Sequence, residues 1–304
     1  MTSVEHRFVF LAGMHRSGTT LLARLLAAHP DVSGFSGTDV PADEGQHLQS
    51  VYPPAKVWGG PGRFGFAPDA HFTEADASEE KARRLFEEWS PHWDLARPVL
   101  LEKSPPNLLK TRFLQALFPG ASFVVVLRHP IAVTLATAKW RQTRRYGRLV
   151  EHWLRCHEIF EADKPQLERV HVIRYEDLVR EPEPVLRGVF EFLELEPIPP
   201  SEPVEAGADE RYFAQWQALK HDPRMRGVPR LLVAAIRAPR AAVGLQPPLS
   251  GVGSRDREAL GRSRRRLRRR HRRRRRGRAD PSGRVRGSTE QPPRCPRASA
   301  EELR

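Results

Sequence analysis

A turn bounded by two glycines, near the N-terminus, constrains the fold of this chain more than any other feature. Before it, Phe8–Ala12 is an unbroken apolar run, which predicts a buried strand. After it, leucines at positions 21, 22, 25 and 26 recur at helical spacing. The turn itself reads Gly13-Met14-His15-Arg16-Ser17-Gly18-Thr19-Thr20. A strand, a glycine turn and a helix in this order direct backbone N–H groups and a helix N-terminus at one point, which favours a phosphate or sulfate ligand.

Apolar segments alternate with helical patterns along the rest of the chain. Strands are predicted near Val32 and over 99–102, 122–127 and 170–173, and helices over 78–89, 106–118, 131–146, 149–162 and 183–193. The alternation predicts one α/β domain with a central parallel sheet flanked by helices. Residues 31–78, rich in Gly, Pro and Asp, predict a long loop region, and loops of this length are often functional.

Charge is distributed very unevenly along the 304 residues. Residues 222–304 hold 25 Arg and no Lys and carry a net charge of +18, so residues 1–221 carry −4 of the chain's total of +14. The sequence pI of about 10.7 is therefore a property of the C-terminal end. We place a folded domain at 1–227 and a low-complexity basic tail, expected to be disordered, at 228–304.

Three interpretations of this tail are open. It can bind nucleic acid or acidic membranes without specificity, or it can be a solvated extension. It can also be a translation of out-of-frame, GC-rich coding sequence, which yields Arg, Pro, Gly and Ala without Lys. We favour the third, because helical and strand patterning stops abruptly near Arg224.

Cysteine content and hydropathy exclude several classes of protein. Cys156 and Cys295 lie far apart, so neither a disulfide framework nor a metal-ligand spacing is present. The apolar run Phe8–Ala12 is too short for a signal-peptide core or a membrane span. We expect a cytoplasmic protein with no membrane span, no metal and no specific nucleic-acid partner. Nothing in the sequence indicates its oligomeric state.

The glycine turn differs from the loop of nucleoside-triphosphate enzymes. That loop has the pattern G-x-x-x-x-G-K-[ST], and Thr19 stands here where the Lys belongs. Arg16 is the cation instead. The strand 122–127 is followed by Arg128, a cation where a magnesium-binding Asp would be expected. Both differences disfavour magnesium-dependent phosphoryl transfer and favour a donor with two separate anionic groups. A P-loop kinase and a non-enzymatic nucleic-acid binder remain as alternatives.

Four segments, in order, resemble the family of sulfotransferases that use 3'-phosphoadenosine-5'-phosphosulfate (PAPS). The resemblance spans roughly residues 6–220. The segments are Arg16-Ser17-Gly18-Thr19-Thr20, Glu102-Lys103-Ser104-Pro105, Val126-Leu127-Arg128-His129-Pro130 and Arg174-Tyr175-Glu176-Asp177-Leu178. The resemblance implies a P-loop NTPase-like fold, PAPS as co-substrate, and no metal.

Carried over to this sequence, the resemblance also implies which residues hold the donor. Arg128 is expected to bind the 3'-phosphate, a good match for a guanidinium fork. Family members place a Ser eight residues further on, where this chain has Ala136, so Thr134 or Thr137 is expected to substitute. Tyr175 matches a position against the adenine. The 5'-phosphosulfate is expected to contact the turn residues His15, Arg16, Ser17, Gly18, Thr19 and Thr20.

Sulfuryl transfer needs a base for the acceptor's proton and cations for the charge that develops on oxygen. Arg16 and Lys103 are the predicted cations. Asp43-Glu44-Gly45-Gln46-His47 lies in the long loop, where several family members carry a catalytic carboxylate or histidine. Glu44 is our first choice as base and His47 the second. The acceptor is a hydroxyl or similar group on a carbohydrate, lipid, small molecule or peptide, and the sequence does not select among these.

Overall fold

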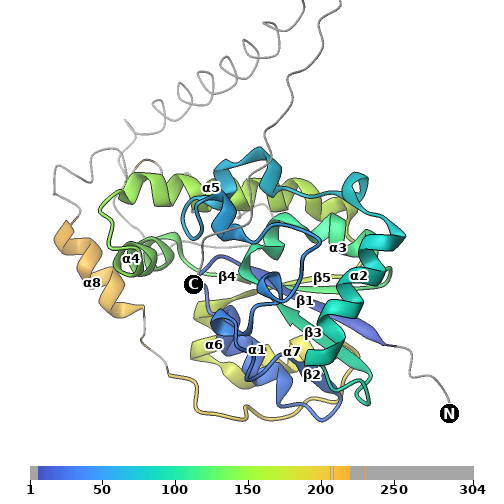
Figure 1. Ribbon diagram of the computed structural model, residues 1–304. Coiled ribbons are helices and arrows are strands. Elements are labelled where there is room, and N and C mark those ends of the chain that lie inside the picture. The colour runs from blue at the N-terminus through green and yellow to red at the C-terminus, as the bar shows by residue number, and fades with distance from the viewer. Residues whose placement is uncertain (1–5, 206, 208, 220–229, 231–304) are drawn as a thin grey trace, which may run out of the picture. The chain divides into compact units, whose positions relative to one another are not determined.

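Five parallel strands form the centre of the molecule in the computed structural model, which describes residues 6–205, 207, 209–219 and 230. The strands are β1 (Arg7–Gly13), β2 (Val32–Gly34), β3 (Val99–Lys103), β4 (Ser122–Leu127) and β5 (Val170–Arg174). Their order across the sheet is β2-β3-β1-β4-β5, with every pair parallel. The predicted α/β fold is thereby confirmed, and Figure 1 shows the sheet enclosed by helices.

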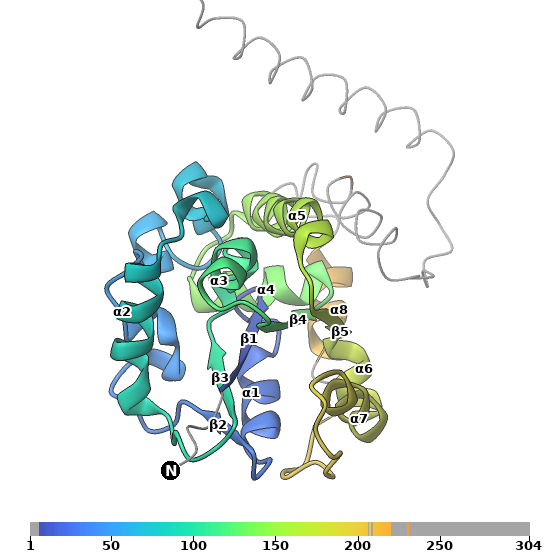
Figure 2. The same ribbon diagram turned by 90° about the vertical axis from the view of Figure 1, so that its right-hand side faces the viewer.

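Helices cover both faces of the sheet, because side chains along each strand alternate between the two faces. Val9 and Leu11 of β1 pack in a core with α1 (Thr19–Ala27), α6 (Tyr175–Arg180) and α7 (Pro182–Phe192). Phe10 and Ala12 point the other way, towards helices on the opposite face. Those helices are α2 (Glu79–Trp89), α3 (Thr111–Leu117), α4 (Pro130–Trp140) and α5 (Tyr146–Asp163). Figure 2 shows α1, α6 and α7 on one side of the strands and α3, α4 and α5 on the other.

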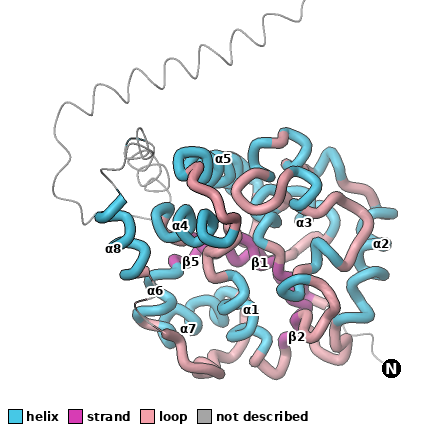
Figure 3. The backbone as a smooth tube through the Cα atoms, turned by 60° about the vertical axis from the view of Figure 1, so that its left-hand side comes forward, coloured by secondary structure: helices cyan, strands magenta, loops and turns pink. Residues whose placement is uncertain are grey.

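The long segment between β2 and α2 contains short 3₁₀ turns but no α-helix or strand among its residues, all of which are described. The turns are Pro41–Asp43, Gly45–His47, Ala55–Trp58, Phe64–Phe66, Pro68–Ala70 and Glu74–Asp76. Three more lie elsewhere, at Ser90–His92, Pro105–Leu109 and Lys164–Gln166. The predicted long loop is therefore confirmed, and Figure 3 shows it as alternating short turns and loops at one side of the strands.

Several boundaries differ from those predicted. The helix expected over 106–118 starts as the 3₁₀ turn Pro105–Leu109 and continues as α3 only after Lys110. The helix expected to reach residue 146 ends at Trp140, where a turn with Gln142 at φ 48° separates α4 from α5. Helices α6 and α8 (Glu210–Leu219) were not predicted. Helix α8 packs against α4.

The boundary predicted at residue 227 and nearly all of the predicted tail 228–304 lie outside the described residues. The described residues fall within one unit, Met1–Ser250. No helix among them is long and apolar enough to cross a membrane.

Candidate active site

The glycine turn lies between the end of β1 and the start of α1, as predicted, and both glycines are required by its geometry. Gly18 has φ 100°, and a Cβ there would overlap the ring of Tyr175. At Gly13 a Cβ would lie 2.7 Å from Ser17 Oγ and 2.8 Å from the carbonyl oxygen of Val126. The N-terminus of α1 is not capped by a side chain. Its first N–H groups are therefore available to an anion.

Polar side chains of this turn are unevenly exposed. The Ser17 hydroxyl is buried, with no hydrogen-bond partner among the described residues. His15 is buried too, and burial, followed by the positive charge of Lys103, lowers its pKa to about 3, so it is neutral at physiological pH. Arg16 is exposed at φ 70°, with its guanidinium carbon 5.6 Å from the centre of the Trp140 ring. A non-glycine residue held at positive φ is strained, and such strain gathers at functional sites.

Arg128, at the end of β4, connects the turn to the neighbouring strand ends. Its Nη1 donates to the carbonyl oxygen of Arg16 at 2.7 Å, and its guanidinium stacks 4.0 Å from the ring centre of Tyr175. Its Nε donates to the Asp209 carboxylate at 3.1 Å, and Nη2 donates to the same carboxylate. The structure thus brings Arg128, Tyr175 and the turn together, as predicted. Asp209 was not predicted.

Thr134 and Thr137, the predicted substitutes for the missing Ser, are both buried on α4. They line a small cavity with His15 and His152, and Arg128 is not among the residues of that cavity. The Thr134 hydroxyl has no hydrogen-bond partner among the described residues. Their role as ligands of the 3'-phosphate stays a prediction.

Glu44 and Lys103 form a buried pair beside the turn. The Lys103 Nζ lies 3.5 Å from Glu44 Oε1 and donates to the carbonyl oxygen of Ala42 at 2.5 Å. Lys103 ends β3, in register with Leu11 of β1, while Glu44 comes from the long loop. Burial raises the pKa of Glu44, and the charge of Lys103 and a hydrogen bond from Gln46 oppose that rise. A carboxylate with a raised pKa, kept near a cation, is suited to accept a proton.

His47, the second candidate base, is half-buried in the same loop. Burial lowers the pKa of His47, as do the charges of Lys56 and Lys103. It therefore carries no charge at neutral pH. No hydrogen bond or ion pair among the described residues joins the side chain of His47 to Glu44.

A buried polar network, which the sequence did not reveal, holds the loop that carries Glu44. Gln46 donates from Nε2 to Glu44 Oε2 at 2.5 Å, and its own backbone N–H donates to Ser104 Oγ at 2.9 Å. Ser104 in turn donates to Glu102 Oε1 at 2.6 Å. Gly45 allows this approach, because a Cβ there would lie 2.5 Å from Glu102 Oε1. Burial raises the pKa of Glu102 to about 7.

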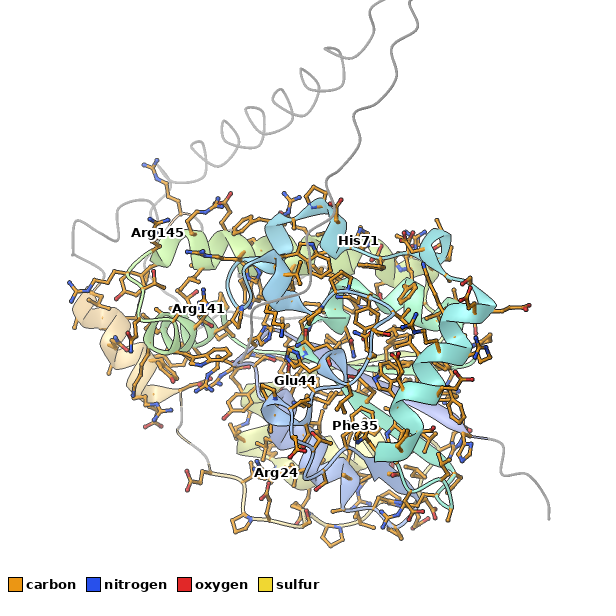
Figure 4. All side chains as sticks on the ribbon, in the orientation of Figure 1. Arg24, Phe35, Glu44, His71, Arg141 and Arg145 are labelled. Carbon is orange, nitrogen blue, oxygen red and sulfur yellow. The ribbon has the colours of Figure 1, made fainter. Side chains whose placement is uncertain are left out.

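A cleft of about 690 Å³ opens beside Lys103. It is bounded by α1, by the residues after β2 and by the loop before Glu44; among its lining residues are Thr20, Arg24, Phe35, Ser36, Asp43 and Lys103. Figure 4 labels Arg24 and Phe35, which both line this cleft. Thr20 of the glycine turn and Asp43, next to Glu44, both line the cleft, whereas Glu44 itself does not.

The predicted residues therefore form two groups that share the glycine turn. One group contains Arg128 and Tyr175, and the other contains Lys103, Glu44 and His47. Arg16 belongs to the turn, but its side chain makes no hydrogen bond or ion pair with Glu44 or Lys103 within the described part of the chain. The sequence could have indicated Ser104, which lies in a recognised segment, whereas nothing around Asp209 distinguishes it from other polar residues.

Two solved structures that resemble this chain give TM-scores below 0.5. The sulfotransferase domain from the curacin biosynthetic pathway is 17% identical and covers 81% of this chain and 100% of that one, with a TM-score of 0.47. The sulfotransferase from Alicyclobacillus acidocaldarius is 17% identical, covers 71% and 93% of the two chains, and gives a TM-score of 0.41.

Sequence comparisons match this chain to parts of longer proteins. Protein-tyrosine sulfotransferase 2 of Gallus gallus is 26% identical over 200 residues, which are 63% of this chain and 52% of that protein. Protein-tyrosine sulfotransferase of Drosophila melanogaster is 26% identical over 63% of this chain and 38% of that protein. The chain thus spans about half the length, or less, of these two relatives. A family model described as "Sulfotransferase family" matches residues 9–200, more than half of the chain, and includes every residue of the two groups above, whereas Asp209 lies outside the match. The chain belongs to the sulfotransferase family.

Proposed function

We propose that this protein transfers a sulfuryl group from PAPS to a hydroxyl group of an acceptor. The observation that carries the proposal is the buried Glu44–Lys103 pair beside an uncapped, glycine-bounded anion loop. A base, a cation and an anion site are the minimum that the reaction needs. Membership of the sulfotransferase family supports the same reaction class.

In this proposal the donor is bound at two anionic ends. The 5'-phosphosulfate lies in the turn Gly13–Thr20, against the N–H groups that begin α1 and the buried Ser17 hydroxyl. The 3'-phosphate binds Arg128, whose guanidinium is held over the turn by its bond to Arg16. Tyr175, which stacks on Arg128, provides an aromatic face for the adenine.

The reaction is an in-line displacement at sulfur. Glu44 takes the proton of the acceptor hydroxyl, the acceptor oxygen forms a bond to sulfur, and the bond from sulfur to the 5'-phosphate oxygen breaks. Lys103 stabilises the negative charge that develops on that oxygen, and Arg16 moves from Trp140 to the equatorial sulfuryl oxygens. The products are the sulfate ester, adenosine 3',5'-bisphosphate and protonated Glu44, which returns its proton to water.

The acceptor is proposed to enter the cleft beside Lys103. Two relatives are named protein-tyrosine sulfotransferases, so a tyrosyl peptide is the first acceptor to test. The cleft lining mixes Phe35 with hydroxyl and charged groups, which also suits carbohydrate, lipid or small-molecule hydroxyls.

The test is sulfuryl transfer from ³⁵S-labelled PAPS, with tyrosyl peptides and a cell extract as acceptor pools. We expect label transfer by the wild-type protein and none above background by Arg16→Ala. In parallel, adenosine 3',5'-bisphosphate is expected to raise the melting temperature, because a ligand at 100–1,000 times Kd stabilises a fold by about 3–4 kcal/mol. Stabilisation by ATP with magnesium alone would contradict the proposal and favour a kinase.

A further inference from the structure

One bidentate edge of the Arg128 guanidinium, formed by Nε and Nη2, is already occupied. A guanidinium binds a phosphate or carboxylate best through two parallel N–H donors, and the Nε and Nη2 donors of Arg128 both point to the Asp209 carboxylate. A third nitrogen of Arg128, Nη1, donates to the carbonyl oxygen of Arg16. An incoming 3'-phosphate therefore finds a carboxylate in its place.

The Arg128–Asp209 pair is also shielded from water. The two side chains are only 9% and 11% exposed. The rings of Tyr175 and Tyr212 lie 4.0 Å and 5.8 Å from the Arg128 guanidinium carbon. Within such a site a cation needs one anionic partner, but two anions on the same edge repel each other strongly.

Asp209 reaches Arg128 because it immediately precedes α8. The carbonyl oxygen of Asp209 accepts from the N–H groups of Tyr212 and Phe213 at 2.9 Å and 3.0 Å, so its backbone belongs to the first turn of that helix. Helix α8 packs against α4, which begins at Pro130, two residues after Arg128. The carboxylate is thus delivered by a separate element, 81 residues away from Arg128 along the chain.

We propose that Asp209 occupies the site of the donor's 3'-phosphate in the donor-free protein and must leave Arg128 when the donor binds. The inference rests on the proposed function, since it assumes that Arg128 receives a 3'-phosphate. Asp209 keeps Arg128 paired and oriented while the site is empty. It also weakens the binding of every nucleotide with a 3'-phosphate, and leaves nucleotides without that group unaffected.

The test compares two nucleotides on the full chain by isothermal titration calorimetry. Asp209→Asn keeps the side-chain shape and removes the charge, so we expect adenosine 3',5'-bisphosphate to bind at least tenfold more tightly than to the wild type. Adenosine 5'-phosphate is expected to bind both proteins within a factor of two. Glu210→Gln is the matched control: it removes one exposed charge from the same helix turn, from a side chain that makes no hydrogen bond or ion pair with Arg128 among the described residues, and is expected to change neither affinity by more than twofold.

The outcomes are distinct. Unchanged or weaker binding of the bisphosphate by Asp209→Asn overturns the inference, because Asp209 would then only support Arg128. Equal tightening for both nucleotides, or the same tightening by Glu210→Gln, also overturns it, because the effect would be one of general charge. If neither the wild type nor Asp209→Asn binds the bisphosphate, the proposed function fails, and the inference fails with it.

A second measurement applies if Asp209→Asn unfolds because the buried Arg128 has lost its anionic partner. We then expect adenosine 3',5'-bisphosphate to restore the folded fraction of Asp209→Asn, measured by circular dichroism, at concentrations where adenosine 5'-phosphate does not. The folded fraction is restored if the 3'-phosphate takes the place of the Asp209 carboxylate beside Arg128. Failure of the bisphosphate to restore the fold contradicts the inference.

Discussion

At the scale of single residues, Glu44 has an environment that balances opposing effects. Burial favours its neutral form, while Lys103 and Gln46 favour the carboxylate. Neither influence alone gives a useful base: an exposed Glu has too low a pKa to accept a proton readily, and an isolated buried Glu stays protonated. His47 is near the same cation, but among the described residues its side chain makes no hydrogen bond or ion pair with Glu44, so removal of that side chain leaves Glu44 in place.

This contrast predicts different outcomes for two substitutions. Glu44→Gln is expected to lower kcat by about 10²–10⁴-fold, the usual contribution of a general base, with donor affinity unchanged. His47→Gln is expected to change kcat by less than about threefold, since it leaves that base in place. Steady-state kinetics with calorimetry of the bisphosphate product separates the two effects. A large loss in His47→Gln alone would make His47 the base.

Gln46 gives a second prediction, for pH dependence. Its Nε2 donates to the ionised form of Glu44 and so lowers the pKa of Glu44. Gln46→Leu removes that donor, and the pKa of Glu44 rises. The acid limb of the kcat/KM profile is then expected to shift to higher pH, while the rate on the alkaline side of that limb changes little.

The matched control for Gln46 is Gln166→Leu, at an exposed position in the turn after α5. Its profile is expected to follow that of the wild type. An equal loss of rate at every pH in Gln46→Leu would instead show that Gln46 supports only the loop structure.

At the scale of elements, the glycine turn depends on its contact with the start of α6, which directly follows β5. Gly18 leaves room for the Tyr175 ring, and that ring supports Arg128. The turn, the start of α6 and the end of β4 therefore form one packed unit. A change in any of the three is expected to alter both phosphate sites.

The glycine contact can be isolated with a matched pair of variants. Gly18→Ala introduces strain at φ 100° and an overlap with Tyr175, whereas Gly120→Ala introduces strain at φ 77° with nothing within 4 Å of its Cβ. Overpacking costs about 1–3 kcal/mol, so the free energy of unfolding of Gly18→Ala should fall below that of Gly120→Ala by this amount. Denaturant titration measures it. Equal losses in the two variants would mean that the Tyr175 ring moves away without cost.

The sequence predicted these elements to different degrees. The strands and the glycine turn were predictable, because buried parallel strands are continuous apolar runs and the turn has a fixed glycine spacing. The Gln46–Ser104–Glu102 network was not, because it joins polar residues 58 positions apart through backbone and side-chain bonds that leave no periodic pattern. Helix α8 and Asp209 were missed for a similar reason, since their effect on Arg128 depends on tertiary packing alone.

At the scale of the whole molecule, charge separates the domain from the C-terminal end. Residues 222–304 carry +18 and the remainder carries −4. Binding to nucleic acid, where it occurs, is expected to depend on the basic residues and to fall steeply with salt, because each neutralised phosphate releases counterions. The residues proposed above to bind the donor all lie before residue 222.

Deletion of residues 228–304 tests this separation. The shortened chain is expected to lose affinity for DNA and to keep its affinity for adenosine 3',5'-bisphosphate within about twofold, because the contacts of Arg128 and Lys103 described above all lie before residue 220. Fluorescence anisotropy with labelled DNA, at 50 mM and 200 mM salt, measures the first effect and calorimetry the second. Loss of bisphosphate binding on truncation would instead assign part of the donor site to the deleted residues.

The loop before Glu44 closes on itself, and this bears on how such an enzyme can diversify. Thr38 donates from its backbone N–H and its hydroxyl to Asp43 Oδ1, at 2.7 Å and 2.5 Å, so residues 38–43 form a small ring, and Lys103 contacts this ring through the backbone carbonyl oxygen of Ala42. Part of the cleft lining lies just before and within that ring. Under the proposed function, natural selection can exchange the side chains of this short stretch, and with them the choice of acceptor, while the backbone carbonyl that accepts from Lys103 is kept.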